Sequence, residues 1–153
     1  MMIFLRLFIL LLSITMLCSC EQNPLPSDKI DINTAAKDWN SASKIWNETE
    51  LVQLEKGKRL YRASCAACHL SSGEGQQQTI GSPALKNNSI VKGKIEVLSD
   101  IILNGRNSMP AFADSINNND LTKVISYIRN AWGNNSNSIV DKSTIDLLMP
   151  ESN

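Results

Sequence analysis

Three stretches of the chain repeat apolar residues at every third or fourth position, which is the spacing of an amphipathic helix. The repeats consist of Leu51, Leu54 and Tyr61 in residues 47–64, of Ile95, Leu98, Ile101 and Ile102 in residues 94–105, and of Leu121, Val124, Ile125 and Ile128 in residues 117–133. Asn47 with Glu50 three residues later is typical of a capping box at a helix start. No stretch alternates as a strand would, so the pattern predicts a small all-α fold of three main helices and loops.

The first residues differ from everything that follows. Residues 1–19 are almost continuously apolar with Arg6 near the start, a pattern typical of a secretory signal. The letters LCSC at residues 17–20 resemble a lipoprotein signal in which Cys20 becomes the lipid-bearing first residue. The alternative is an uncleaved anchoring helix, although the run falls short of the ~20 residues that span a membrane. Both interpretations place the rest of the chain at a membrane, on the periplasmic side.

The remaining boundaries follow from composition. Residues 20–46 begin with prolines and polar residues and predict a tether to a domain at residues 47–133. Trp39 and Trp46 lie seven apart, a spacing that also suits a short helix packed on the domain or on a partner. Residues 134–153 predict a polar tail. It is either disordered or holds a partner through Ile145, Leu147, Leu148 and Met149.

Charge excludes one class of function. The sequence has 15 basic and 15 acidic residues, so no strong field is available to hold nucleic acid. Between residues 55 and 106 the balance is locally positive, with Lys56, Lys58, Arg59, Arg62, Lys86, Lys92, Lys94 and Arg106 against Glu55, Glu74, Glu96 and Asp100. This excess of positive charge would favour docking to an acidic partner. The alternative is that these side chains are ordinary solvated surface residues.

The letters CAACH at residues 65–69 carry the candidate chemistry. Cys65 and Cys68 are the two cysteines outside the signal, and His69 is the only histidine. This pattern is the attachment signature of c-type haem, because cysteines three apart present both sulfurs to the two vinyl groups of one porphyrin. Three alternatives fit less well. A thioredoxin-type site requires a βαβ unit, which the sequence does not predict, and a structural zinc site would need further ligands that the sequence lacks. A plain disulfide would leave the adjacent histidine unexplained.

The second axial ligand of a haem iron bound to His69 must come from elsewhere. Met109 and Met149 are the methionines that follow the signal, and Met149 lies in the polar tail. Met109 is expected in a loop, where Pro110 keeps it extended. Ligation by His69 and Met109 closes the iron, so one-electron exchange is the predicted chemistry. A methionine that releases the iron, giving peroxidase-like or gas-binding activity, is the alternative.

The sequence resembles a class I cytochrome c over about residues 50–133. GKRLYRASCAACH, GSPAL, ILNGRNSMPAF and VISYIRNAWGN occur in the family's order. Within this family, the sequence is most similar to bacterial monohaem cytochromes that act as subunits or partners of respiratory dehydrogenases and terminal oxidases. The resemblance implies one covalent haem c, a carrier that is not itself an enzyme, redox proteins as donor and acceptor, and a membrane reached through the lipid anchor.

The resemblance also implies roles for single residues. The Pro83 carbonyl accepts a hydrogen bond from the imidazole of His69, which makes the ring a better iron donor. Leu85 packs on the haem face and Arg106 pairs with a haem propionate. A loop-shaping proline and an exposed arginine are the ordinary alternatives for Pro83 and Arg106.

The family further implies a close crossing of the first and last helices. Gly57 and Tyr61 then meet the last helix near Val124 and Tyr127, because glycine lets two backbones approach. Trp132 is expected to cover the haem edge or the helix ends, without a chemical role.

Overall fold

The computed structural model describes residues 29–148, so the predicted signal, Cys20 and Met149 lie outside the described range. The α-helices are α2 (Ile32–Trp39), α3 (Glu48–Ser64), α4 (Ala66–His69), α5 (Gln77–Ile80), α6 (Ser89–Lys92), α7 (Ile95–Asn104), α8 (Asn118–Asn130) and α9 (Lys142–Leu148), and a 3₁₀ turn, η1, covers Ala131–Gly133. The described residues contain isolated bridges but no strand, which confirms the all-α fold. Within residues 29–148 no helix combines the length and the apolar character that a membrane span needs.

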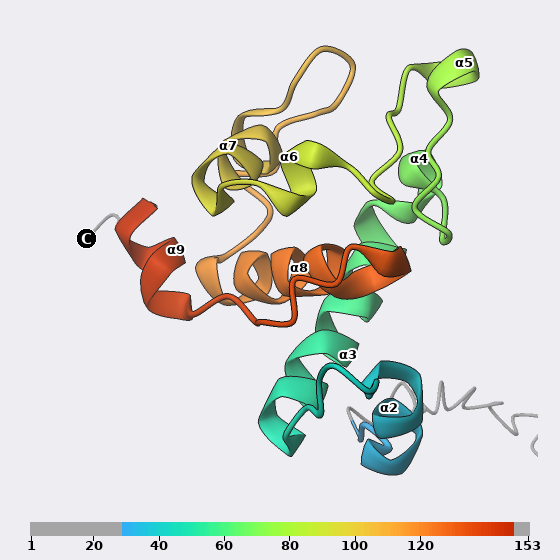
Figure 1. Ribbon diagram of the computed structural model, residues 1–153. Coiled ribbons are helices and arrows are strands. Elements are labelled where there is room, and N and C mark those ends of the chain that lie inside the picture. The colour runs from blue at the N-terminus through green and yellow to red at the C-terminus, as the bar shows by residue number, and fades with distance from the viewer. Residues whose placement is uncertain (1–28, 149–153) are drawn as a thin grey trace, which may run out of the picture.

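The crossing of α3 and α8 organises the molecule (Figure 1). The predicted capping box begins α3, since the Asn47 and Glu50 side chains each accept a hydrogen bond from the other residue's backbone N–H. At Gly57 an added Cβ would overlap with the carbonyl oxygen of Lys123 on α8. Only glycine permits this approach, and the expected crossing is therefore present.

The other predicted helices agree with the structure, with a small shift in α7. Asn117 caps α8 by accepting a hydrogen bond from the Asp120 N–H at 2.9 Å. The predicted inward residues of α8 are all buried. On α7 the buried face centres on Leu98 and Leu103, while Ile101 and Ile102 stay half exposed. In Figure 1, α6 and α7 lie along one side of α8, and α4 and α5 lie beyond its C-terminal end.

The described part of the segment before α3 packs on the domain, as the spacing of Trp39 and Trp46 suggested, and does not extend from it as the predicted tether. The side chains of Ala35 and Trp46 are buried against Leu51 and Leu54 of α3. The indole N–H of Trp46 donates to the Trp39 carbonyl at 3.1 Å. The physical reason is that the first half of α3 extends past α8, as Figure 1 shows, and its apolar face needs cover. Residues 20–28 of the predicted tether are outside the described range.

The segment after α8 also belongs to the packed body, contrary to the expected polar tail. Val140 and Ile145 join the main core cluster, and α9 packs across α8. The Gln53 amide on α3 donates to the Val140 carbonyl at 3.0 Å, so the segment is attached to both long helices. Leu147 stays exposed. The many asparagines and serines around residues 134–143 hide this packing from a search for apolar periodicity.

Two substitutions on α9 test this packing. Ile145→Ala removes a side chain that is 0% exposed and should lower the free energy of unfolding by about 2–4 kcal/mol. Leu147→Ala, on the same helix but 84% exposed, should change it by less than about 0.5 kcal/mol. Denaturant titration of the haem-loaded protein measures both. Equal, negligible losses would show that this segment is not part of the folded body.

Candidate functional site

The CAACH motif forms one tight turn at the end of α3. The helix stops at Ser64, and Cys65 is the N-cap of α4, where its carbonyl accepts hydrogen bonds from the N–H groups of Cys68 (3.1 Å) and His69 (2.9 Å). Residues three apart on such a turn share a face, so both sulfurs point to the same side. Both thiols are free, Cys65 half-buried and Cys68 exposed.

The Cys65 thiol lacks the lowered pKa of a reactive cysteine. Burial, with a smaller contribution from Cys68, raises the pKa of Cys65 to about 11. A reactive cysteine needs a lowered pKa, because the thiolate is the nucleophile. The described residues also contain no group of three His, Cys, Asp or Glu side chains placed to hold a metal ion, which removes the zinc alternative for that range.

His69 is held in one tautomer by the loop that follows the motif. The side chain is 8% exposed, and its Nδ1 lies 2.9 Å from the carbonyl oxygen of Pro83. Because a carbonyl only accepts, Nδ1 must carry the proton, and the lone pair remains on Nε2. No described residue donates a hydrogen bond to Nε2. An imidazole oriented in this way by its second nitrogen is typical of a metal ligand. The hydrogen bond expected from the resemblance is thus present.

Met109 lies in the long loop between α7 and α8. Arg106 and Met109 exchange two backbone hydrogen bonds of 3.1 and 2.9 Å, which closes a tight turn. The turn starts at Gly105, whose φ is +74°, and the Met109 side chain is half-buried. The Ser108 hydroxyl donates to the Ile80 carbonyl of α5 at 3.5 Å and so connects this turn to the motif side of the molecule. The Arg106 side chain is exposed and makes no ion pair with a described residue.

The elements around the motif leave apolar surface that side chains do not cover. Leu60, Leu85, Ile95 and Ile102 pack against the main core cluster but remain half-buried, and Met109 and Phe112 are half-buried too. A large apolar cofactor would complete such a core. The donors present also fit a haem: two free thiols on one turn, an imidazole with its Nε2 lone pair available, and a thioether on the loop between α7 and α8.

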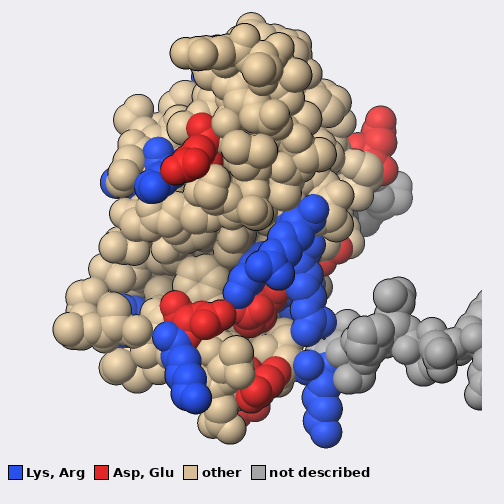
Figure 2. All heavy atoms as spheres, turned by 90° about the vertical axis from the view of Figure 1, so that its right-hand side faces the viewer, with Lys and Arg blue, Asp and Glu red and all other residues tan. Residues whose placement is uncertain are grey.

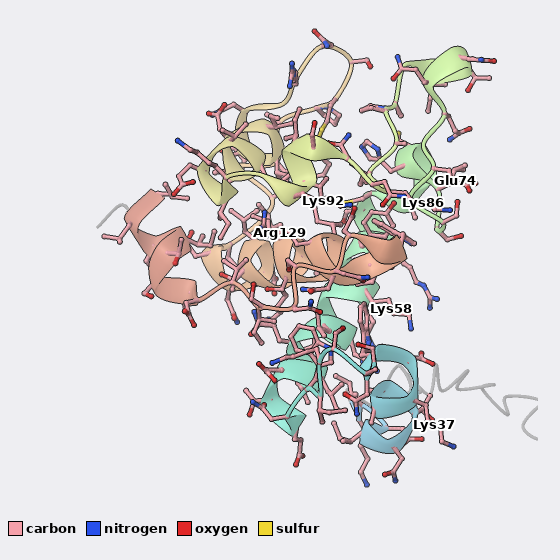
Figure 3. All side chains as sticks on the ribbon, viewed as in Figure 1. Lys37, Lys58, Glu74, Lys86, Lys92 and Arg129 are labelled. Carbon is pink, nitrogen blue, oxygen red and sulfur yellow. The ribbon has the colours of Figure 1, made fainter. Side chains whose placement is uncertain are left out.

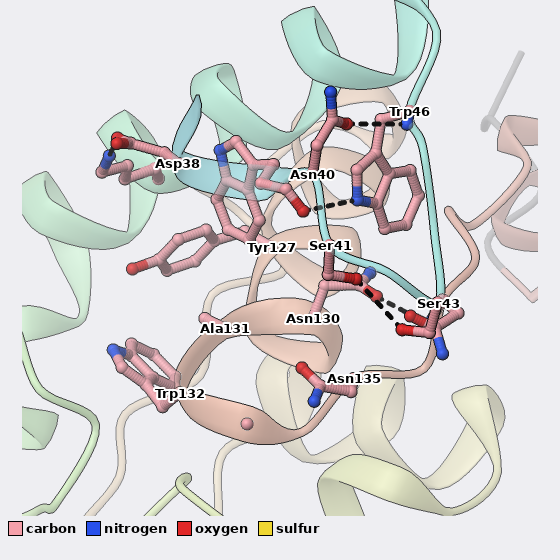
Figure 4. A pocket seen from close by; sticks show the side chains of 14 residues that line it. Asp38, Asn40, Ser41, Ser43, Trp46, Tyr127, Asn130, Ala131, Trp132 and Asn135 are labelled. Atoms are coloured by element: carbon pink, nitrogen blue, oxygen red, sulfur yellow. Dashed lines mark hydrogen bonds and ion pairs between the residues drawn. The ribbon is translucent and has the colours of Figure 1, made fainter. Parts of the chain in front are cut away.

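A hollow elsewhere among the described residues is a different site. About 500 Å³ in volume, it lies between the segment 38–46 and the end of α8, where Trp39, Trp46, Tyr127 and Trp132 contribute to its wall (Figure 4). Neither the cysteines of the motif nor His69 nor Met109 line it. Its polar groups largely bind one another, as the hydroxyls of Ser41 and Ser43 do at 3.0 Å. It is therefore not the place for the cofactor.

The expected excess of positive charge is partly neutralised by neighbours. Lys58 lies 3.2 Å from Asp38 and 3.3 Å from Glu55, and Lys86 lies 3.5 Å from Glu74 (Figure 3). Figure 2 shows basic and acidic side chains interleaved on the face that it presents, while the topmost part, where α5 lies, is largely uncharged. This face therefore has no uniform basic patch.

Comparison with known proteins identifies the family. Residues 52–128 match the family model described as cytochrome C oxidase, cbb3-type, subunit III. The chain is a class I c-type cytochrome of this family. The cytochrome is also similar to cytochrome c6 of Gracilaria tenuistipitata var. liui, with 31% identity over 84 residues that cover 54% of this chain and 76% of the relative. For cytochrome c6 of Bumilleriopsis filiformis the identity is 30% over 77 residues, covering 49% and 87%. For that of Leptolyngbya boryana it is 32% over 75 residues, covering 47% and 85%.

Family membership establishes the coarse function of this cytochrome. It is a monohaem electron carrier, not an enzyme, with covalently attached haem c and redox proteins as partners. The expected electron-carrier class and cofactor are therefore confirmed.

Tyr61 and Trp132 were predicted to lie at the helix crossing and at the haem edge or helix ends, but their hydrogen bonds near the motif, and Asn134 altogether, were missed in the sequence. The Tyr61 hydroxyl donates to the Leu70 carbonyl at 2.6 Å, directly after His69, and burial raises the pKa of Tyr61 well above its usual value. Trp132 and Asn134 contact the loops on either side of the histidine. No local signal identified these contacts, because each joins segments far apart in the chain.

A glycine pair tests the turn that holds Met109. Gly105 and Gly81 share a positive φ of +74° and +73°, but Gly105 has ψ of 173°, in a region that almost only glycine occupies, whereas Gly81 has ψ of 11°, in the left-handed helical region. Alanine therefore also carries more backbone strain at Gly105 than at Gly81. Only at Gly105 would the new Cβ lie 2.5 Å from the Met109 carbonyl oxygen; at Gly81 the nearest atom is the Ser108 Oγ at 3.5 Å. Gly105→Ala should therefore lower the free energy of unfolding by about 1–3 kcal/mol more than Gly81→Ala does. Equal losses in denaturant titrations would contradict this geometry.

Proposed function

We propose that this cytochrome passes single electrons between membrane-associated redox proteins of a respiratory chain, with its iron bound by His69 and Met109. The hydrogen bond from His69 Nδ1 to the Pro83 carbonyl is the observation that carries the proposal, because it leaves Nε2 as the donor. In this assignment Cys65 and Cys68 form the thioethers. The haem, when bound, supplies a reversible one-electron couple.

The surrounding residues each contribute one property. Pro83 orients the imidazole and strengthens it as a donor, and Leu85 offers an apolar surface to the porphyrin. Arg106, whose charge is not neutralised by a described residue, suits a propionate. The soft thioether of Met109 favours the ferrous state and so raises the potential.

The inventory of side chains favours transfer over catalysis. His69 is the only histidine in the sequence, so no second imidazole is available to move protons above the iron. With both axial positions filled, neither dioxygen nor peroxide reaches the metal unless Met109 leaves. No specific observation favours the labile-methionine alternative.

The partners are proposed from the family. The matching family is described as a subunit of a cbb3-type cytochrome oxidase, so a terminal oxidase suits as acceptor and a dehydrogenase as donor. The largely uncharged surface around α5, together with the 46% exposed side chain of Ile80, suits a contact close to the cofactor.

We further propose that a lipid on Cys20 anchors this cytochrome on the periplasmic side. Residue 29, the first described residue, lies nine positions after Cys20. Even a fully extended chain covers only about 30 Å over that separation. The domain would therefore remain close to the membrane, within reach of membrane-bound partners.

Met109→Ala tests the axial assignment. Loss of the thioether should lower the midpoint potential by a tenth or more of the roughly 0.8 V range that axial ligands cover. Cyanide or carbon monoxide should then bind quickly to the iron. Potentiometry and absorption spectroscopy measure both effects. Met149→Ala is the matched control and should behave as wild type. Rapid binding of carbon monoxide or cyanide by the unaltered protein would instead support the labile-methionine alternative.

Cys20→Ser tests the anchor. Without the lipid, the protein should move from the membrane fraction to the soluble fraction, because the buried acyl chains provide the membrane affinity. Cys18→Ser, two residues earlier, should stay with the membrane. Retention of Cys20→Ser in the membrane fraction would favour the uncleaved anchoring helix.

A further inference from the structure

One residue in the turn that follows α8 has an unfavourable backbone conformation. Trp132 has φ of 53° and ψ of 29°, in the left-handed region, which a bulky side chain rarely occupies. Such strain persists only where the surroundings impose it, and it concentrates at functional sites. We call Trp132, Gly133 and Asn134 the clasp.

The first residue of the clasp fixes the loop that follows His69. The Trp132 indole lies so close to Gly73 that an added Cβ there would be 2.5 Å from its Cε3 atom. Its N–H donates to the Ser71 carbonyl at 3.0 Å. The indole also packs on Tyr61 and Tyr127, with ring centroids 4.9 and 5.3 Å away, and Figure 4 shows Trp132 near Tyr127 at the end of α8.

The last residue of the clasp fixes the loop that bears Pro83. Asn134 is 6% exposed, and its side-chain amide donates to the carbonyls of Leu85 at 3.0 Å and Ile128 at 2.7 Å. Its Oδ1 is buried and accepts no hydrogen bond from the described residues. Burying an unpaired acceptor is unfavourable. The two hydrogen bonds donated by the Asn134 amide must therefore outweigh this cost and keep the side chain buried.

Both contacts converge on the histidine. The loop beneath Trp132 ends at Gly75, whose N–H donates to the His69 carbonyl at 3.0 Å. The loop held by Asn134 presents the Pro83 carbonyl to His69 Nδ1. The two loops are joined at Gly73, whose carbonyl accepts from the N–H groups of Leu85 (2.8 Å) and Lys86 (2.9 Å). The clasp therefore ties the end of α8 both to the loop that bonds the His69 backbone and to the loop that bonds its imidazole.

We propose that Trp132 and Asn134 are positioning residues that hold the Pro83 carbonyl on His69 Nδ1 and thereby set the donor strength of Nε2. This inference rests on the proposed role of His69 as an iron ligand. A hydrogen bond accepted from Nδ1–H makes the ring a stronger donor, which favours ferric iron. Loosening the Pro83 loop should weaken that bond and raise the midpoint potential.

Asn134→Ala in the full-length, haem-loaded protein tests the proposal. It removes both amide donors without changing charge. NMR of the reduced protein should show the His69 Nδ1 proton exchanging with solvent about tenfold faster than in wild type. The midpoint potential should rise. Asn119→Ala makes the same chemical change at an exposed position in the first turn of α8 and should alter neither quantity.

Trp132→Phe is the second variant, and it tests the proposal if Asn134→Ala does not fold or does not take up haem. It deletes the N–H that donates to Ser71 but keeps an aromatic ring against Tyr61 and Tyr127. Exchange and potential should shift in the same direction as for Asn134→Ala, by a smaller amount. Unfolding measured in parallel separates positioning from stability.

The outcomes distinguish the two proposals. If the variants lower stability but leave the exchange rate and the potential at the wild-type values, the clasp is merely structural and the inference is overturned. Failure of the proposed ligand role would appear in the wild type itself, as haem lost on acid–acetone extraction or as a spectrum without histidine ligation, whatever the variants do.

Discussion

The contact between the backbones of α3 and α8 at Gly57 governs the rest of the structure. Because no side chain separates the helices there, Tyr61, one turn further along α3, meets Tyr127, with ring centroids 5.3 Å apart. Tyr61 also reaches the Leu70 carbonyl, which fixes the chain just after the motif. The crossing therefore determines where the CAACH turn lies relative to the end of α8. A wider crossing would separate the motif from the residues that hold its loops.

Cover for this small crossed pair comes from three sources. The segment before α3 shields the first half of that helix, and the segment with α9 shields the start of α8. The third source is the cofactor, since the side chains around the motif are apolar but only half-buried. A domain of this size buries little apolar surface, so its stability depends on all three sources of cover. The cofactor thus has a structural as well as a redox role.

The site has few reactive groups, and hydrogen bonds or packing fix the orientation of each. The Cys65 thiol is half-buried with a raised pKa, the single imidazole has one defined tautomer, and the Met109 turn is closed by two backbone hydrogen bonds. None of these groups is placed to transfer a proton to a substrate. The proposed coordination by His69 and Met109, held by these contacts, would keep its geometry similar in both oxidation states, and this suits a protein that exchanges electrons.

Interactions between residues close together in the chain determined the main helices and the cofactor motif. The capping box at Asn47, the repeat along α8 and the CAACH turn depend on residues within a few positions of one another, so the sequence alone predicted the helices and the cofactor. The tertiary structure decided which polar segments are covered. Trp46, Ile145 and Asn134 stand among residues that show no apolar period, and their partners are distant: Asn134 bonds to Leu85, 49 positions away. Only the folded chain brings such groups together, because the helix crossing, not the local sequence, sets the distance between them.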